Sequence, residues 1–285
     1  MSEDSYVIIS CVKNEAKVIK STLDSVVSQT KLPLEWIIID DNSEDDTREI
    51  LKTYSQKFAW IKWFRNEKVK LNEKGARIAS IINTYSDMIV SDYRFLAKLD
   101  GDVRLPREFY SSMLLEFKRN RRLGIASGSL IYLGKKERNI YEDLTRGATK
   151  MYRKECYLDI GGLQLTTGWD TLDNIIAQSK HWETRVLDVW FDHLEEEGAS
   201  QGYFLKYYNV GKYCGKVPYH SWYFGLKLVY RIFEKPIGIS TLLLAFGYVN
   251  SRFINVERPF PVEVSNYFRD KQSKLLREGL KNYFK

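Results

Sequence analysis

Two carboxylates one residue apart end an apolar stretch of the sequence. The segment FLAKLDGDVRLP, residues 95–106, runs into Asp100 and Asp102. Two anions this close repel each other, so a positive charge or water must accompany them. Their oxygens suit a hard divalent cation, which would also bind a diphosphate. The other interpretation is a plain turn, because Asp-Gly pairs are common in tight turns without any metal.

A second acidic cluster, DDNSEDDT at residues 40–47, follows another apolar run. Asn, Ser and Asp commonly cap helices, so Ser43 or Asp46 is a candidate for the start of the next helix. Capping does not account for five acids within seven residues. Because such a cluster repels phosphate, we interpret it as a hydrogen-bond acceptor for a nucleobase or a ribose.

Arg77 and His193 have the chemistry to complete such a site. Arg77 lies in a predicted helix at 75–85, and its guanidinium can meet two oxygens at once, those of Asp41 or Asp100 or those of a phosphate. His193 follows a predicted strand and offers a nitrogen ligand for the metal, although a lone histidine is more often structural.

Asp170 lies in the segment GWDTLD, at the predicted start of a helix. The positive end of a helix dipole favours an ionised carboxylate, which a general base requires. Capping of the helix explains Asp170 and Asp173 equally well. The functional alternative for this segment is a general base that takes a proton from an acceptor hydroxyl.

The elements that must position these residues alternate between strand and helix. β-Branched runs predict strands and apolar residues at helical spacing predict helices. The strands are expected at 6–12, 34–40, 60–64 and 94–100, and the helices at 15–30, 47–58 and 74–86. This alternation predicts an α/β fold with a mostly parallel sheet, in which ligands bind beyond the carboxyl ends of strands. The clusters KNE, DDNSEDD and DGD each follow a strand, so we expect the site at that edge.

Charge and aromatic residues are concentrated in the last third of the chain. The formal net charge is +7, yet residues 201–285 hold 14 Lys and Arg against 5 Asp and Glu, which leaves 30 against 32 for residues 1–200. Residues 203–255 are rich in Tyr, Trp and Lys, and their apolar run at 236–249 is shorter than the roughly 20 residues that span a bilayer. We expect attachment to an anionic membrane surface. A core-packing helical subdomain or a dimer interface is the alternative.

The three cysteines are scattered and odd in number. This argues for a reducing compartment and against a disulfide scaffold. The first fifteen residues contain no basic segment followed by an apolar run, so we expect no signal peptide. We expect a cytoplasmic protein with peripheral association at the inner face of the cell membrane.

Together these clusters resemble those of the family 2 glycosyltransferases, which have the GT-A fold. The resemblance covers about residues 5–195 and rests on VIISCVKNE, IIIDDNSEDDT, KGARIASIIN, LAKLDGDVRLP and GWDTLDNIIAQSKHWETRV, in the family's order. The tail resembles that of a bacterial and archaeal subgroup that works at membranes. The implied organisation is a GT-A domain at 1–200, with nucleotide-sugar binding in 1–105 and the acceptor side in 106–200, followed by a helical region at 201–285.

The resemblance also implies roles for individual residues. The nucleotide pocket would be formed by Cys11, Asn14, Glu15, Asp41, Arg77 and Asp100. Asp102 would be the main metal ligand and His193 an additional one. Asp170 would be the catalytic base, although many members carry an acidic pair where this chain has Trp169-Asp170.

The implied reaction is transfer of a sugar, with inversion, from a nucleotide-diphosphate-sugar to a hydroxyl of a glycan or lipid-linked acceptor. Mn²⁺ or Mg²⁺ would support the departing diphosphate. UDP is the expected nucleotide, with GDP and dTDP as alternatives. Two other classes of protein remain: a nucleotidyltransferase of related fold, which would usually have a glycine in the SCVKNEAKV segment, and a non-catalytic protein that binds polyanions or membranes. The acidic edge repels nucleic acid, so we expect no such partner.

Overall fold

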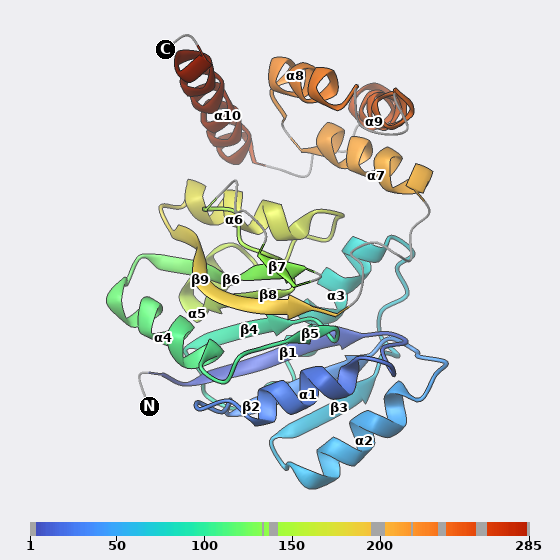
Figure 1. The fold of residues 1–285 in the computed structure, drawn as a ribbon, viewed down its shortest axis with the longest axis vertical. Coiled ribbons are helices and arrows are strands. Elements are labelled where there is room, and N and C mark those ends of the chain that lie inside the picture. The colour runs from blue at the N-terminus through green and yellow to red at the C-terminus, as the bar shows by residue number, and fades with distance from the viewer. Residues whose placement is uncertain are drawn as a thin grey trace. The chain divides into compact units, whose positions relative to one another are not determined.

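The computed structural model describes residues 4–132, 134–136, 142–194, 203–217, 219–232, 238–254 and 261–283. The chain divides into two compact units, Met1–Glu196 and Glu197–Lys285. The first contains the sheet and every residue with a predicted catalytic, nucleotide-binding or metal-binding role. The second is helical (Figure 1).

The first unit is built around one sheet, which has nine strands in the part of the chain that is described. They are β1 (Tyr6–Val12), β2 (Glu35–Asp40), β3 (Ile61–Arg65), β4 (Phe95–Leu99), β5 (Val103–Arg104), β6 (Leu123–Tyr132), β7 (Lys135–Lys136), β8 (Thr149–Arg153) and β9 (Glu183–His193). Their order is β3-β2-β1-β4-β8-β6-β9-β5, with β7 paired to β6. The first four are parallel, β8 is antiparallel to β4 and β6, and β9 is parallel to β6.

Helices cover both faces of this sheet (Figure 1). They are α1 (Ile19–Val27), α2 (Thr47–Lys57), α3 (Lys74–Ser86), α4 (Phe109–Arg119), α5 (Lys154–Asp159) and α6 (Trp169–Ser179). α1, α2 and α4 pack on one face and α3, α5 and α6 on the other. All six residues of β2 are buried, as expected for a strand covered on both faces. The predicted α/β fold with a mostly parallel sheet is confirmed.

The register brings the three polar clusters to one edge. Val12 pairs with Asp40 at the ends of β1 and β2, and β4 runs parallel to β1 with Ile9 opposite Lys98. The segments that follow these strands therefore leave the sheet on the same side. This is the edge at which the sequence predicts the site.

Two boundaries differ from the sequence-based expectation. The helix predicted at 15–30 extends only over Ile19–Val27, because the preceding Val18 has a φ of −123° and lies outside the helical region. His193 does not follow its strand but is the last residue of β9, where it pairs opposite Val103 of β5.

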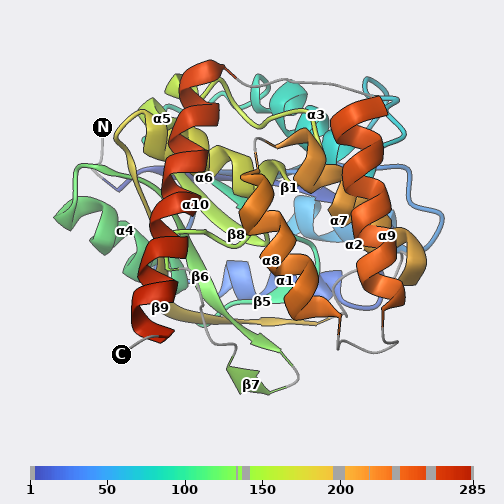
Figure 2. The ribbon, with the colours of Figure 1, turned by 90° about the horizontal axis from the view of Figure 1, so that it is seen from above.

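The second unit consists of α7 (Tyr203–Lys216), α8 (Ser221–Arg231), α9 (Ile239–Val249), the π-helical turn η1 (Asn250–Ile254) and α10 (Val262–Tyr283). Within this unit α8 lies between α9 and α10 (Figure 2). Of the predicted membrane segment 203–255, residues 218, 233–237 and 255 lie outside the described residues. No helix in the described ranges has the length and apolar character that crossing a membrane requires.

Close contact between α7 and α9 depends on glycine. A Cβ atom on Gly211 would lie 2.1 Å from the carbonyl oxygen of Leu244, and one on Gly247 would lie 2.2 Å from that of Tyr208. Only a residue without a side chain permits this approach. The small core of the unit is formed by Cys214, Phe224, Leu244 and Tyr248.

Candidate functional site

Asp100, Asp102 and His193 meet at the predicted edge of the sheet. Each offers one ligand atom, and these atoms all lie within 4.8 Å of one another. His193 Nε2 is 3.6 Å from Asp102 Oδ2. The pairing of β5 with β9 produces this arrangement, because the amide of Leu194 donates to the carbonyl of Asp102 at 2.8 Å. The structure thus brings the two predicted metal ligands, Asp102 and His193, together with Asp100, which the resemblance places in the nucleotide pocket.

A tight turn at Gly101 places the two carboxylates. The Thr22 hydroxyl of α1 donates to the Gly101 carbonyl at 2.7 Å, and the Val103 amide donates back to that hydroxyl at 3.2 Å. A Cβ atom on Gly101 would lie 2.8 Å from Val12 Cγ1, so a larger residue would force Val12 or the turn to shift. The two interpretations of the Asp-Gly-Asp segment are therefore compatible, since the turn is what holds the carboxylates in position.

Lys98 is a charged partner that sequence reasoning missed. This lysine is 3% exposed; its ammonium forms an ion pair with Asp100 and donates to the Gly147 carbonyl at 2.8 Å. The sequence did contain a signal for this ion pair. A lysine inside an apolar strand must find a partner, and residues two apart in a strand share a face. The negative charge of Asp102 is compensated less than that of Asp100, which forms the ion pair with Lys98. Burial, followed by the charge of Asp100, raises the pKa of Asp102.

The three side chains fit a divalent cation. Two carboxylates and an imidazole supply oxygen and nitrogen donors, a set that suits Mn²⁺ or Mg²⁺. The side chain of Asp100 is 33% exposed and that of Asp102 16%, so one side of the cluster is open to a diphosphate or water. A cation there would also offset the mutual repulsion that raises the Asp102 pKa.

Arg77 pairs with Asp41 and not with Asp100. Its Nε and Nη2 donate to the two Asp41 oxygens at 2.6 and 2.5 Å, and Asn66 Nδ2 adds a third hydrogen bond at 2.8 Å. Burial by itself would raise the pKa of Asp41, but the hydrogen bonds from Arg77 and Asn66 outweigh it and hold that pKa below its usual value. An ionised carboxylate offers about four acceptor positions, so one remains for a donor on a ligand.

The turn after β1 is hydrogen-bonded to the acidic cluster. The Asn14 amide donates to Ser43 Oγ at 2.9 Å, and Asn14 Oδ1 accepts from the Glu44 amide at 2.8 Å. The Glu15 amide donates to Thr47 Oγ1 at 2.8 Å. The segments predicted to line one nucleotide pocket are therefore held together as one piece of structure.

Part of the acidic cluster does have a capping role, though through neither Ser43 nor Asp46. Asp45 Oδ1 accepts from the amide of Thr47 at 3.1 Å and from its hydroxyl, and Asp45 Oδ2 accepts from the Ala16 amide at 3.0 Å. Asp46 occupies the position before α2 without a side-chain hydrogen bond to the helix. Asp45 thus starts the helix and also ties it to the turn after β1.

Cys11 lies in β1 opposite Ile39, beside the carboxylates of both acidic clusters. Burial, followed by the negative charge of Asp41, raises the pKa of its thiol. The side chain therefore stays a neutral, half-buried thiol, which suits the wall of a pocket and not a nucleophile.

Asp170 lies beside Gly147 and is partly buried, whereas Asp173 lies in the core. Asp170 is in the first turn of α6, and a Cβ atom on Gly147 would lie 3.0 Å from its Oδ2. Gly147 is the residue whose carbonyl accepts the Lys98 ammonium. Asp173 is completely buried and forms an ion pair with Lys150 at 2.5 Å. Burial raises the pKa of Asp173 to about 6.

Trp169 has a structural reason to replace the acidic residue expected beside Asp170. It is 6% exposed, and its ring centroid lies 5.3 Å from the Lys98 ammonium and 5.7 Å from that of Lys150. The face of an indole attracts cations without adding negative charge. The Trp169 ring thus interacts with both Lys98, beside the acidic edge, and Lys150, which pairs with Asp173 of α6.

Comparison with curated proteins identifies relatives of the first unit. Residues 7–166 match the model of the family "Glycosyl transferase family 2". A poly-beta-1,6-N-acetyl-D-glucosamine synthase of Staphylococcus epidermidis is 32% identical over 120 residues, which are 41% of this chain and 26% of that protein. The match therefore spans about a quarter of the length of this curated relative.

Comparison with solved structures shows the same fold. S. aureus TarS 1-349 in complex with UDP-GlcNAc has a TM-score of 0.56 at 17% identity, over 93% of this chain and 78% of that chain. The mannosyltransferase PcManGT from Pyrobaculum calidifontis, in complex with GDP-Man and Mn²⁺, has a TM-score of 0.56 at 11% identity, over 98% and 80%. These similarities show the GT-A fold. Because the family model covers more than half of the sequence, the chain belongs to glycosyl transferase family 2.

Proposed function

We propose that this protein is an inverting glycosyltransferase that moves a sugar from a nucleoside diphosphate to a hydroxyl acceptor. The observation that carries the proposal is the cluster of Asp100, Asp102 and His193 at the carboxyl edge of the sheet, with Asp170 beside Gly147, whose carbonyl accepts from Lys98. An acid cluster for a metal and a nearby carboxylate for a base are the two elements this reaction requires.

The donor nucleotide occupies the pocket formed by the segments after β1 and β2. Asp41, held ionised by Arg77, accepts a hydrogen bond from the base. UDP is favoured because TarS was solved with UDP-GlcNAc and with UDP, while the GDP-Man complex of PcManGT keeps GDP as the alternative. dTDP is the third nucleotide to test.

Asp100, Asp102 and His193 hold Mn²⁺ or Mg²⁺, and Mn²⁺ is present in the PcManGT complex. The cation, when bound, supplies positive charge to the departing diphosphate. Asp102 is the main ligand because it is the less compensated of the two carboxylates. Asp100 is the weaker ligand, since the Lys98 ammonium already neutralises it and orients it.

Asp170 acts as the base. Its carboxylate takes the proton of the acceptor hydroxyl as the hydroxyl oxygen bonds to the anomeric carbon. The bond from that carbon to the diphosphate breaks on the opposite side, and the nucleoside diphosphate leaves with the electron pair. Attack opposite the leaving group inverts the anomeric configuration. The acceptor is a glycan or a lipid-linked saccharide.

Calorimetric titration of the nucleotides tests the proposal. UDP, GDP and dTDP are each titrated with and without Mn²⁺, into the wild type, Asp102→Asn and the control Asp192→Asn. Asp192 is next to His193 but forms an exposed ion pair with Arg104, so its loss has little effect. We expect one nucleotide to bind with a requirement for both Mn²⁺ and Asp102. Failure of the folded wild type to bind any of the three would refute the proposal.

We further propose that the second unit attaches the enzyme to the cytoplasmic face of an anionic membrane. Residues 203–254 contain seven Lys and Arg and one acid, Glu234. Large apolar side chains are exposed along α8, α9 and η1, namely Trp222, Leu226, Val229, Ile239, Leu242, Phe246, Val249 and Phe253. An apolar face among basic residues is the pattern of a helix that lies in the headgroup region.

Flotation with vesicles tests this attachment. We expect the protein to float with vesicles that contain phosphatidylglycerol, less so at high salt, and not with purely phosphatidylcholine vesicles. Leu242→Glu and Phe246→Glu change residues that are 71% and 62% exposed, so the fold tolerates them while binding weakens. Equal flotation of the wild type and these variants would contradict the proposal.

A further inference from the structure

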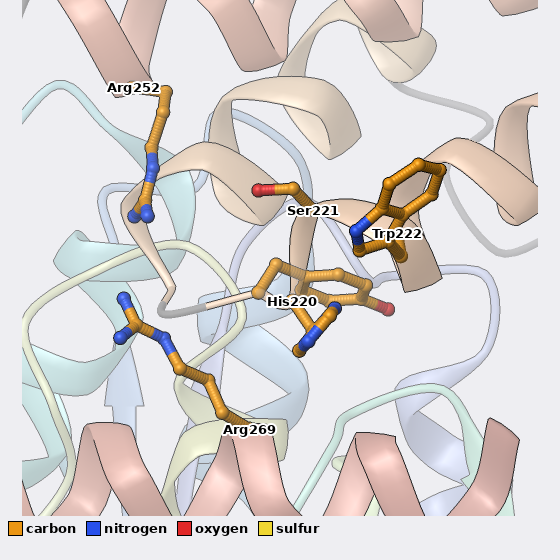
Figure 3. Close-up of a pocket in the computed structure, with 6 residues that line it drawn as sticks. His220, Ser221, Trp222, Arg252 and Arg269 are labelled. Atoms are coloured by element: carbon orange, nitrogen blue, oxygen red, sulfur yellow. The ribbon is translucent and has the colours of Figure 1, made fainter. Parts of the chain in front are cut away.

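The second unit contains a pocket that the proposed sugar transfer does not use. Its volume is about 350 Å³, and it is lined by Tyr219, His220, Ser221, Trp222, Arg252 and Arg269 (Figure 3). This volume falls within the range of about 300–1,000 Å³ that is typical of small-molecule sites. All six residues belong to this one unit, and we call it the double-arginine pocket.

Two arginines from different elements converge on this pocket. Arg252 comes from η1 and Arg269 from α10, and their guanidinium groups point toward each other (Figure 3). Within the described ranges, neither forms an ion pair with a carboxylate. Two like charges directed at one space repel each other, and an anion between them would convert that repulsion into two attractions.

Buried contacts hold Arg269 in place. Gln272 is 3% exposed, and its Oε1 accepts from the His220 amide at 2.6 Å. Phe268 is 8% exposed and packs edge-on against Tyr219, with ring centroids 5.5 Å apart. Arg269 lies between these two residues on α10, so the contacts that bind α10 to the start of α8 also direct the guanidinium into the pocket.

Arg252 is held in a similar way. The neighbouring Ser251 is buried, and its hydroxyl donates to the Lys212 carbonyl at 2.8 Å. A Cβ atom on Gly215 would lie 3.2 Å from the Arg252 amide nitrogen, so η1 is pressed against α7. The turn is π-helical, a local geometry that is frequent at functional sites.

The pocket contains further donors. α8 is eleven residues long, and the Ser221 and Trp222 amides in its first turn have no acceptor among the described residues. Amides at a helix start favour anions. His220 also lines the pocket, and its buried Nδ1 has no hydrogen-bond partner within the described chain.

We infer that the double-arginine pocket binds a phosphate group. Two guanidinium groups, an imidazole and two amides are more donors than a carboxylate can accept, whereas a phosphate monoester has three terminal oxygens and a charge of about −1.5 to −2. The phosphate belongs to a lipid headgroup or to a soluble compound. Trp222, which lines the pocket, and Phe253, which follows Arg252 in η1, are 79% and 70% exposed, and a lipid would cover them. The inference does not depend on the proposed sugar transfer.

The test uses the full chain and two double variants. Arg252→Gln/Arg269→Gln removes both pocket charges. Lys274→Gln/Arg277→Gln removes two charges from exposed positions of α10 outside the pocket. Inorganic phosphate is titrated calorimetrically at constant ionic strength. Vesicles with equal fractions of phosphatidic acid or phosphatidylglycerol are compared by flotation, with inorganic phosphate as the competitor. Arg252→Lys/Arg269→Lys, which keeps the charges but loses the forks, replaces the first variant if that fails to fold.

We expect the phosphate Kd to rise at least about tenfold in the pocket variant and to stay within about twofold in the control. Loss of phosphatidic-acid binding in the same variant, with competition by phosphate, would assign a lipid source. Unchanged vesicle binding would assign a soluble one. Phosphate binding that is absent from the wild type, or equal in both double variants, overturns the inference. Nucleotide binding in the same samples reports separately on the transferase site.

Discussion

Lys150 and Asp173 form an ion pair in which both side chains are completely buried, with Nζ 2.5 Å from Oδ1. The Tyr152 hydroxyl donates to Asp173 Oδ2 at 2.5 Å. Asp173 is therefore bound to the core from two sides. Asp170, three residues earlier on α6, faces Gly147 and is only partly buried. Two carboxylates of one helix thus have different surroundings, and single substitutions test whether their roles differ as well.

Asp170→Asn should abolish proton transfer without weakening the fold. Loss of a general base typically lowers kcat about 10²- to 10⁴-fold. The donor KM and the melting temperature should change little, because Lys150 of the core ion pair donates to the main-chain carbonyl of Asp170, which the substitution keeps. Nucleotide release from the donor sugar, measured at steady state, checks the rate. A kcat close to that of the wild type would exclude Asp170 as the base.

Asp173→Asn, in contrast, should lower the stability of the fold. Removing one partner of a buried ion pair costs about 3–5 kcal/mol, because Lys150 remains charged without compensation. Urea denaturation measures this free energy of unfolding. Replacing both partners in Lys150→Met/Asp173→Leu should recover part of it. If Asp173→Asn is as stable as the wild type and inactive, the roles of the two aspartates are reversed.

His193→Asn should weaken metal binding. Replacing even an outer-shell partner of a metal site typically costs about 10- to 100-fold in affinity, so loss of a direct ligand should raise the Mn²⁺ Kd at least tenfold. Titration of free Mn²⁺ by electron paramagnetic resonance measures it. His181→Asn is the matched control, because His181 is exposed, lies outside the cluster and has a φ of 67°, which asparagine tolerates. Equal affinities in both variants would remove His193 from the ligand set.

Gly101→Ala should displace the turn between the two carboxylates. The new methyl group would meet Val12 Cγ1 at 2.8 Å and Ile19 Cδ1 at 3.2 Å. We expect a loss of about 1–3 kcal/mol in unfolding free energy and weaker Mn²⁺-dependent nucleotide binding. Gly225→Ala in α8 is the control, because its added methyl group meets no atom within 4 Å. A fully active and stable Gly101→Ala would show that the turn can relax.

Glu35, the first residue of β2, allows a test of how the free energy of unfolding depends on pH. Burial by itself would raise its pKa, but hydrogen bonds from Lys62 and Ser91 outweigh burial and lower it. A lowered pKa stabilises the folded state above the unfolded value of about 4.3, and this stabilisation is lost as the pH falls through the folded value.

The wild type should therefore exceed Glu35→Gln by about 1–2 kcal/mol at pH 7, and the difference should shrink toward zero near pH 3. Unfolding in urea at both pH values measures it. Nucleotide affinity should not change, since Glu35 and Asp41 lie at opposite ends of β2. A difference that persists at pH 3 would mean that the ionised carboxylate is not its source.

Local patterns predicted the strands and the edge at which the clusters meet, because β-branched runs and the residues that follow them are neighbours in sequence. They could not assign Asp173 to the core. Its partner, Lys150, comes from β8, twenty-three residues away, and the antiparallel insertion of β8 between β4 and β6 has no local signature. The double-arginine pocket was missed for the same reason, since Arg252 and Arg269 meet only when α10 packs against α8.

Because the two-residue strand β5 pairs with β9, the cluster of Asp100, Asp102 and His193 depends on contacts from distant parts of the first unit. Asp102 is held by Thr22 from α1, which contacts both neighbours of the aspartate, and by Leu194 after β9. No fragment shorter than residues 22–194 contains all these contacts. A piece ending before β9 would carry the acidic motif without its imidazole and without the strand that orders it. Residues 1–105, which are predicted to bind the nucleotide, therefore do not form the cluster on their own, because it is complete only when β9 joins the sheet.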